Sequence, residues 1–446
     1  MITYSIMQKS QLEGASRLDA EYYQPDYLRS QNRLMAFKTS PLSSLCKVTD
    51  GNHSSISECF IKSGVRYLRG QDLTDFFISY AAPIYIPENV FKKLRRSHIF
   101  KEDVLVSIVG TIGLVSIVAK DFDKLTGNCK IAILHTEKID PWYLAIFLVS
   151  KYGQNQIHRK VAGAVQTGII LKDLAGISIP VFNENEQAKI RQIAINAYEN
   201  QINSEALYSQ AEDLLLKELK LEDFKPMDDL SYIVNLSDVK SNHRIDSEYF
   251  HPKYEQLISK IKNGKMFTAT VENLPSRFNP DDQPDKVFKY VELSNIESFI
   301  GIIDGYSEVL GQEAPSRARR ILKSGDVIVS SVQGSLEKVA LVSREQDGFL
   351  ASTGFFQFRS KVILPEVLLV LARSPILQMQ LEKQCTGTIL TAVSKEGIKN
   401  IIIPILGKST QEEIADLVHQ SHEARKKAKE LLEKAKREVE EFIEEK

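Results

Sequence analysis

The sequence predicts an α+β protein in which two repeated domains are separated by two long helices that form an antiparallel coiled coil, with pseudo-two-fold symmetry. Three observations lead to this fold class. A segment near the start recurs 227 residues later, each copy mixes short β-rich runs with helical stretches, and each copy is followed by a long segment without glycine or proline. The 446 residues also exceed what one ordinary core holds. The expected domains are 1–184 and 226–408, with a central long helix and linker at 185–225 and a C-terminal long helix at 409–446.

The repeat is a strong signal because the same residue types return in the same order. Its register holds to within a few residues along both copies, so both halves should share one fold. Three pairs of segments correspond: RLDAEYYQPDY at 17–27 with RIDSEYFHPKY at 244–254, KEDVLVS at 101–107 with KSGDVIVS at 323–330, and the run ending at Pro180 with the run ending at Pro404.

The elements inside each copy follow from the residue patterns. Runs such as VLVSIV and VSIVAK in the first copy, and DVIVSSV and VALVSR in the second, predict short strands. The stretches PWYLAIFLVSKYGQNQIHRKV and PEVLLVLARSPILQMQLEKQ predict helices ahead of the last strand of each copy. The segment around Pro226 is the expected connector.

The two long segments, 185–219 and 409–445, are each expected to form one helix with an apolar stripe. A stripe with charged flanks in two copies is most simply buried against its counterpart, as a coiled coil. The alternative is a pair of surface helices, each packed on its own domain. The stripe residues are Ile190, Ile193, Ala197, Leu207, Ala211, Leu214 and Leu215 in the first segment, and Ile414, Val418, Ala424, Ala428, Leu431, Leu432, Ala435 and Val439 in the second.

Composition narrows the class of protein. No apolar run could span a bilayer and the first residues do not form a signal peptide, so a cytoplasmic location is expected. The four cysteines, at 46, 59, 129 and 385, have no C-x-x-C spacing, which argues against a zinc ribbon or a disulfide framework and favours buried or half-buried thiols.

Charge is nearly balanced, so any nucleic-acid contact must come from local patches. The net charge is −1, with 22 basic against 17 acidic residues in 1–184 and 22 against 22 in 226–408. The helical segments are acidic and should stay away from a duplex or meet a protein partner.

One basic cluster occurs at the same place in both copies, just ahead of the DVLVS and DVIVS strands, and is a candidate for contacts with DNA phosphates. The alternative is a solvated turn. The residues are Lys92, Lys93, Arg95 and Arg96 in the first copy, and Arg317, Arg319 and Arg320 in the second.

A second candidate is the loop ahead of the RYLRGQDL strand, together with its counterpart. Asn, Arg and Ser side chains hydrogen-bond base edges or phosphates, although in a loop they can equally be turn formers. The residues are Asn52, His53, Ser54 and the strand residue Arg69 in the first copy, and Arg277 and Asn279 in the second.

Catalytic motifs are missing from the sequence. There is no G-x-x-x-x-G-K-[ST] phosphate loop, no G-x-G-x-x-G after a strand and no N-P-P-Y-like segment, so no catalytic residues are assigned. His419 and His422 lie on the last helix without a third ligand, so no metal site is expected. We therefore expect no cofactor in this chain.

Taken in order, the YLRGQDL strand, the DVLVS…GTIG hairpin, a G-x-x-x-T turn, a closing IPV strand and a long helix opening on NEQ resemble the specificity subunits of type I restriction-modification enzymes. The resemblance covers essentially the whole chain and rests on the order of weak motifs. It implies two target-recognition domains, each reading half of a bipartite, non-palindromic site in double-stranded DNA. It also implies that the helices dock two modification (methyltransferase) subunits, which carry S-adenosylmethionine, and that a restriction (nuclease and translocase) subunit joins this core.

The second copy departs from the pattern. GTIG is replaced by QGSLEK at 333–338, and YLRGQD by YVELSN at 290–295, so the two halves need not read the same bases. Two rival functions stay open: a recognition subunit for a fused methyltransferase-nuclease polypeptide, and a coiled-coil interaction protein that binds no DNA.

Overall fold

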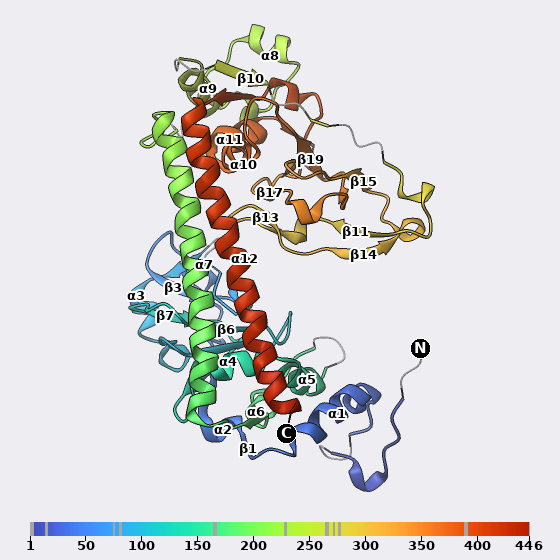
Figure 1. The fold of residues 1–446 in the computed structure, drawn as a ribbon. Coiled ribbons are helices and arrows are strands. Elements are labelled where there is room, and N and C mark those ends of the chain that lie inside the picture. Colours follow the sequence, from blue (N-terminus) through green and yellow to red (C-terminus); the bar gives the residue numbers. More distant parts are fainter. Residues whose placement is uncertain are drawn as a thin grey trace. The chain divides into compact units, whose positions relative to one another are not determined.

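The computed structural model describes residues 4–13, 17–74, 76–79, 83–163, 167–226, 230–263, 267–270, 273–274, 278–387 and 391–445. It is a mixed helix and sheet structure (Figure 1). The chain divides into two compact units. The first unit is Met1–Gln201 with Lys426–Lys446, and the second is Ile202–Arg425.

In the first unit, short strands form a four-stranded sheet of order β2-β8-β5-β6, a three-stranded sheet of order β4-β3-β7, and the pair β1-β9. The strands are β1 (Thr39–Pro41), β2 (Cys46–Asp50), β3 (Val65–Leu68), β4 (Ile84–Ile86), β5 (Val104–Ser107), β6 (Val115–Ile117), β7 (Leu125–Gly127), β8 (Ile131–Thr136) and β9 (Ser178–Pro180). The helices are α1 (Pro25–Leu34), α2 (Leu42–Leu45), α3 (Glu88–Phe91), α4 (Pro141–Val149), α5 (Lys151–Arg159) and α6 (Leu171–Ala175).

The core of the first unit lies between α4 and the four-stranded sheet. Every residue from Pro141 to Leu148 is buried, as expected for a helix that is apolar all round. These residues pack with buried side chains of β5 and β8, such as Val104 and Leu134. The strands predicted at VLVSIV and VSIVAK are confirmed as β5 and β6.

The second unit contains a five-stranded sheet of order β12-β13-β17-β16-β19, a four-stranded sheet of order β14-β11-β18-β15, and the pairs β10-β22 and β20-β21. The strands are β10 (Phe267–Thr270), β11 (Val287–Val291), β12 (Ile296–Glu297), β13 (Ile302–Ile303), β14 (Ser307–Leu310), β15 (Ala318–Ile321), β16 (Val327–Ser330), β17 (Val339–Leu341), β18 (Leu350–Ser352), β19 (Phe355–Phe358), β20 (Cys385–Thr386), β21 (Ala392–Val393) and β22 (Ile402–Ile405). The helices are α8 (Leu236–Asn242), α9 (Pro252–Asn263), α10 (Pro365–Arg373) and α11 (Pro375–Lys383).

The sequence repeat reappears as repeated side-chain hydrogen bonds. In the first unit the Gln156 side chain bonds both backbone groups of Ser178, with distances of 2.9 and 3.0 Å. In the second unit the Gln380 side chain bonds the backbone of Ile402 in the same way, at 2.8 and 3.0 Å. Each glutamine ties a helix, α5 or α11, to the last strand of its unit.

The helical stretch predicted ahead of the last strand is two helices in both units. The chain turns at Ser150 and Ser374, whose backbones are extended and whose hydroxyls accept a hydrogen bond from an N–H of the next helix. An N-cap serine favours a new helix start over continuation. The break therefore has the same physical cause in both copies.

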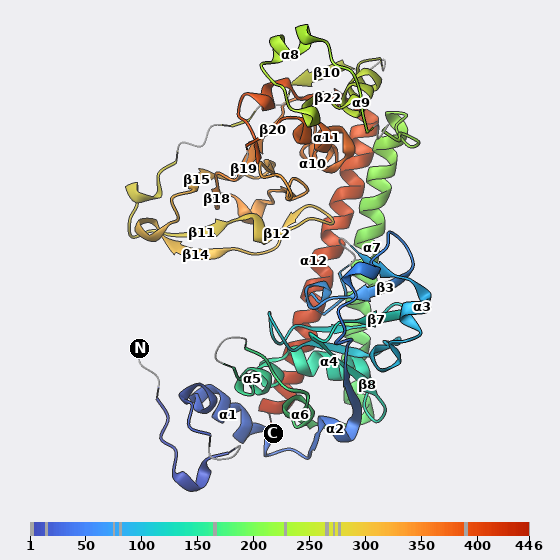
Figure 2. The ribbon, with the colours of Figure 1, turned by 180° about the vertical axis from the view of Figure 1, so that it is seen from behind.

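Both long helices are present, α7 at Glu184–Glu218 and α12 at Lys408–Glu444, and they lie side by side in Figures 1 and 2. In the first unit the Lys189 ammonium lies 2.5 Å from the Glu438 carboxylate, and the Phe182 and Phe442 rings are 5.5 Å apart. Residue numbers rise along one helix as they fall along the other, so the pairing there is antiparallel.

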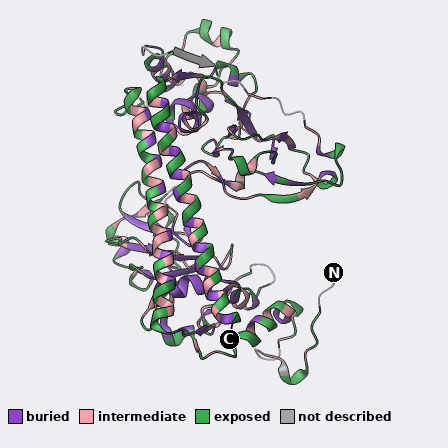
Figure 3. Ribbon diagram, viewed as in Figure 1, coloured by how far each residue is buried: buried purple, intermediate pink, exposed green. Residues whose placement is uncertain are grey.

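The two helices also enter the core of each unit. Figure 3 shows buried positions recurring along both of them. Each helix thus contacts its partner and the globular part of the unit together. The buried helix residues are Ile190, Ala194, Ala197, Leu432, Ala435, Val439 and Ile443 in the first core, and Tyr208, Ala211, Leu215, Ile414 and Val418 in the second.

Candidate nucleic-acid interface

In the first unit, the loop at 50–55 and the basic turn at 92–96 meet at one buried carboxylate. Asp50 ends β2 with a side chain that is 8% exposed. The Arg96 guanidinium lies 2.8 Å from Asp50 Oδ1, and His53 Nε2 lies 2.6 Å from Asp50 Oδ2. Among the described residues no group donates a hydrogen bond to Oδ1, so the Arg96 contact is an ion pair by distance. We define the first patch as Asp50, His53, Lys92, Lys93, Arg95 and Arg96.

The cations of the first patch face solvent. The Arg96 side chain is 70% exposed and the His53 side chain 66%, while Lys92, Lys93 and Arg95 are also exposed. The buried Asp50 carboxylate beneath the exposed Arg96 guanidinium and the exposed His53 imidazole fixes the positions of both groups and leaves their outer faces open to water. Such a surface suits phosphate oxygens.

The loop that carries Asp50 is held close to the turn after β7. A Cβ atom at Gly51 would lie 2.0 Å from the carbonyl oxygen of Asn128, so only glycine fits there. The backbone N–H of Asn52 donates to Gly127 O at 2.7 Å. The loop is therefore a fixed part of the first unit.

Asn52 is a turn former in this structure. Its amide bonds the backbone of Ser54 in both directions, at 2.8 and 3.0 Å, and the residue is buried. This is the second of the two roles that the sequence left open. Ser54 itself is exposed, beside His53.

Arg69 also has a structural contact. Its guanidinium bonds the Asp72 carboxylate at 2.8 and 3.1 Å, and the side chain is 23% exposed. In the second unit the same turn is closed by Asn295, whose side chain accepts from the backbone of Glu292 at 2.9 Å. The substitution of YVELSN for YLRGQD thus preserves the turn with different side chains.

The second unit brings its loop and basic cluster together in a similar way. Arg319 Nη1 donates to Asn279 Oδ1 at 2.8 Å, and Arg317 is exposed beside it in sequence. We define the second patch as Asn279, Arg317 and Arg319. Arg277, the remaining loop candidate, lies outside the described residues.

Arg320 does not share the surface of Arg319. Successive residues of a strand point to opposite faces, and along β15 Arg319 is half-buried while Arg320 is only 4% exposed. Arg320 Nη1 donates to Leu274 O at 2.8 Å, and burial lowers the pKa of its guanidinium. The expectation that Arg320 contacts phosphate is therefore not supported by its position.

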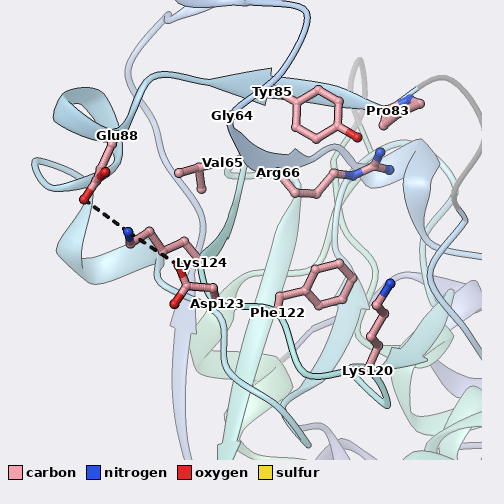
Figure 4. A pocket seen from close by; sticks show the side chains of 10 residues that line it. All are labelled: Gly64, Val65, Arg66, Pro83, Tyr85, Glu88, Lys120, Phe122, Asp123 and Lys124. Atoms are coloured by element: carbon pink, nitrogen blue, oxygen red, sulfur yellow. Dashed lines mark hydrogen bonds and ion pairs between the residues drawn. The ribbon is translucent and has the colours of Figure 1, made fainter.

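A pocket of about 640 Å³ opens beside the first patch, and the sequence did not predict it (Figure 4). Six of its lining residues are Arg66, Tyr85, Glu88, Lys120, Phe122 and Lys124.

The role of Asp50 was not predicted from the sequence either, because a single acidic residue near basic ones forms no motif. Its one visible signal is its position at the end of a strand, just before a glycine-containing loop.

The described residues contain neither a metal-binding cluster nor a membrane-spanning helix. No group of three or more His, Cys, Asp or Glu side chains is placed to hold a metal ion there. Within the same residues, no helix is both long enough and apolar enough to cross a membrane. Cys46 and Cys385 are buried and Cys59 and Cys129 half-buried, as predicted.

Comparison with known proteins places part of the chain in a family. The family model described as "Type I restriction modification DNA specificity domain" matches residues 36–212, which include the first patch. The type I restriction enzyme EcoBI specificity subunit of Escherichia coli is 29% identical over 131 residues, which span 29% of this chain and 28% of that protein.

Two solved structures are also similar. The HsdS subunit from Thermoanaerobacter tengcongensis is 35% identical over 34% of this chain and 41% of that one, with a TM-score of 0.32. The type I restriction-modification S subunit from M. genitalium is 14% identical over 90% of this chain and 92% of that one, with a TM-score of 0.41. The match to the curated relative covers under a third of that protein's length, and the match to the first of these structures under half.

The predicted family is confirmed by these matches. Specificity subunits are the non-catalytic, DNA-recognising members of type I restriction-modification systems, which agrees with the absence of catalytic motifs from the sequence. Residues 36–212 of the chain match the DNA specificity domain of type I restriction-modification systems, and the curated relative that the chain resembles is a specificity subunit of such a system.

Proposed function

We propose that each unit of this chain reads one half of a bipartite site in double-stranded DNA. One observation carries the proposal: both units join a loop to a basic cluster, at Asp50 with Arg96 in the first and at Asn279 with Arg319 in the second. The two surfaces are built from equivalent segments of the repeat but from different residues. Two such surfaces are suited to reading two different half-sites.

The side chains of the patches suggest two roles, binding to phosphates and reading of bases. Exposed guanidinium and ammonium groups neutralise phosphates, which gives affinity and register but no sequence information. Base edges are read by hydrogen bonds from side chains that enter a groove. Ser54 is a candidate for that role, because it is exposed in the loop next to the cations, whereas the Asn279 amide already bonds Arg319 and Asp282.

The remaining parts of the proposal concern the assembly. We propose that α7 and α12 pair as a coiled coil with pseudo-two-fold symmetry and separate domains at 1–184 and 226–408. The helices dock two modification subunits, which bind S-adenosylmethionine, and a restriction subunit joins them in the cytoplasm. The acidic balance of the helical segments supports a protein partner there over DNA.

Methylation mapping tests this function. The chain is expressed with its modification subunits in a host that lacks other methyltransferases, and the methylated sites of the genome are sequenced. We expect one bipartite motif, and no methylation or cleavage from the chain alone. Exchanging 226–408 for the matching part of a relative should change one half-site only. Methyl transfer by the isolated chain, or a change in both half-sites, would contradict the proposal.

A further inference from the structure

We propose that the pocket beside the first patch binds a single unpaired nucleotide, extruded from DNA that is bound at that patch. The inference rests on the proposed function for the source of the nucleotide. All residues that line the pocket belong to the first unit.

The walls of the pocket bring two aromatic rings and two cations together. Arg66 of β3 and Tyr85 of β4 are directly paired across antiparallel strands. Lys120 and Phe122 come from the turn after β6, and the Lys120 ammonium lies 5.7 Å from the centre of the Phe122 ring. Figure 4 shows Tyr85 and Arg66 on one side of the pocket, with Phe122 and Lys120 facing them from the other.

Aromatic rings and cations together are suited to a nucleotide. A base has a flat face that stacks on Tyr or Phe, and this stacking tolerates any sequence. The Lys120 ammonium and the Arg66 guanidinium can bond phosphate oxygens or the edge of the base. A volume of about 640 Å³ is within the range of pockets that hold small molecules.

Arg66 is positioned in advance. The residue is 7% exposed although it lines the pocket, and its Nη2 donates to Ser79 O at 3.0 Å. A guanidinium held by a backbone carbonyl loses little freedom when a ligand binds, so less of the binding free energy is spent on ordering it.

The other end of the pocket is joined to the first patch. Glu88 Oε1 lies 3.1 Å from the ammonium of Lys124, which lines the pocket, and 3.3 Å from that of Lys92, which belongs to the first patch. Hydrogen bonds from Lys124 and then Lys92 lower the pKa of Glu88, so this carboxylate stays charged. DNA seated on the first patch therefore lies next to the pocket, which favours DNA over free nucleotide as the source.

The second unit arranges comparable residues differently. Lys289 of β11 lies 4.7 Å from the ring centre of Tyr306 and 5.3 Å from that of Phe349. Here one ammonium lies over two rings, and it lies closer to both of them than the Lys120 ammonium lies to the Phe122 ring. We therefore assign the nucleotide pocket to the first unit.

A bulged duplex tests the inference. The full chain is titrated with two labelled duplexes of one sequence, fully paired or with one extra unpaired adenosine, at low salt. One stacked base is worth about 1–3 kcal/mol, so we expect the bulged duplex to bind about tenfold more tightly. The double variant Tyr85→Leu with Phe122→Leu should lose this preference and bind the paired duplex as the wild type does.

Two further variants guard against misfolding. Lys120→Ala alters an exposed side chain and should reduce the preference with no change in unfolding temperature. Tyr306→Leu, which removes an aromatic ring in the second unit, should leave the preference intact. Adenosine monophosphate is added as a competitor.

The outcomes are distinct. Equal binding of the two duplexes by the wild type, or a preference that survives the double variant, overturns the pocket assignment and leaves the proposed function standing. If low concentrations of adenosine monophosphate abolish the preference for the bulged duplex, the pocket binds free nucleotide, and the inference that the nucleotide comes from DNA is overturned. Failure to bind either duplex overturns the proposed function together with this inference.

Discussion

Replacing Arg95 and Arg96 with alanine tests whether the first patch contacts the DNA backbone. Both side chains are exposed, Arg96 to 70%, so their removal opens no cavity in the core. If each neutralises one phosphate, the slope of log K against log salt should fall by about 1.8, since each contact contributes about 0.9. From about 50 mM to about 200 mM salt, the wild type should then lose about 12-fold more affinity than the variant.

The assay is the fluorescence anisotropy of a labelled duplex over a series of salt concentrations. Arg29→Ala is the matched control, because Arg29 is 74% exposed and pairs with Asp26 in the same unit, as Arg96 pairs with Asp50. Its salt slope should equal that of the wild type. An unchanged slope with a new preferred sequence would refute our reasoning and make the two arginines base readers. An equal fall of the salt slope in Arg29→Ala would show that the effect is not specific to the first patch.

Three other perturbations have defined outcomes. Arg320→Ala should lower the free energy of unfolding by about 1–3 kcal/mol without changing the salt slope, because it removes a buried side chain and leaves the Leu274 carbonyl without that donor. Arg317→Ala removes an exposed side chain and should lower the salt slope without changing the free energy of unfolding. Burial lowers the pKa of His422, so the folded chain binds fewer protons than the unfolded chain near pH 6, and stability should fall as the pH drops below about 6.5. In thermal unfolding, His422→Gln should lose less stability between neutral and acidic pH than the wild type does. An equal loss of stability in the two proteins would show that His422 is not the group responsible. Adding seven residues within 195–215 of α7 and in the facing part of α12 should move the half-sites apart by about three base pairs, since the insert is about 10.5 Å long and rotates the stripe by only about 20°. Methylation mapping should show the same bases in each half-site. A change in those bases would contradict separate roles for the domains and the helices.

Much of the fold could be predicted from local pattern. The long helices begin and end within a residue of their expected bounds, because glycine and proline are absent and the apolar stripe has helical period. The strands at DVIVSSV and VALVSR were found by their β-branched residues. The break at Ser150 was missed because an apolar run of that length looks like one continuous helix until the capping contact is seen.

The candidate site was less predictable, since it depends on contacts between distant segments. Arg319 and Arg320 are equivalent in the sequence pattern, and only the pairing of β15 decides which one faces solvent. The link between Asp50 and Arg96 joins residues 46 positions apart and has no local signature. Asn52 was singled out by residue type, which cannot distinguish a turn former from a base reader.

The entry of α12 into the first core has a consequence for how the protein is made. Leu432, Ala435 and Val439 complete a core whose other members lie between Leu34 and Ala197, so more than 200 residues separate the two contributions. A ribosome releases the first unit's sheets long before it has synthesised the segment that closes them. The unit translated first is therefore the last to finish folding, and until then its apolar surface depends on chaperones or on temporary pairing for protection.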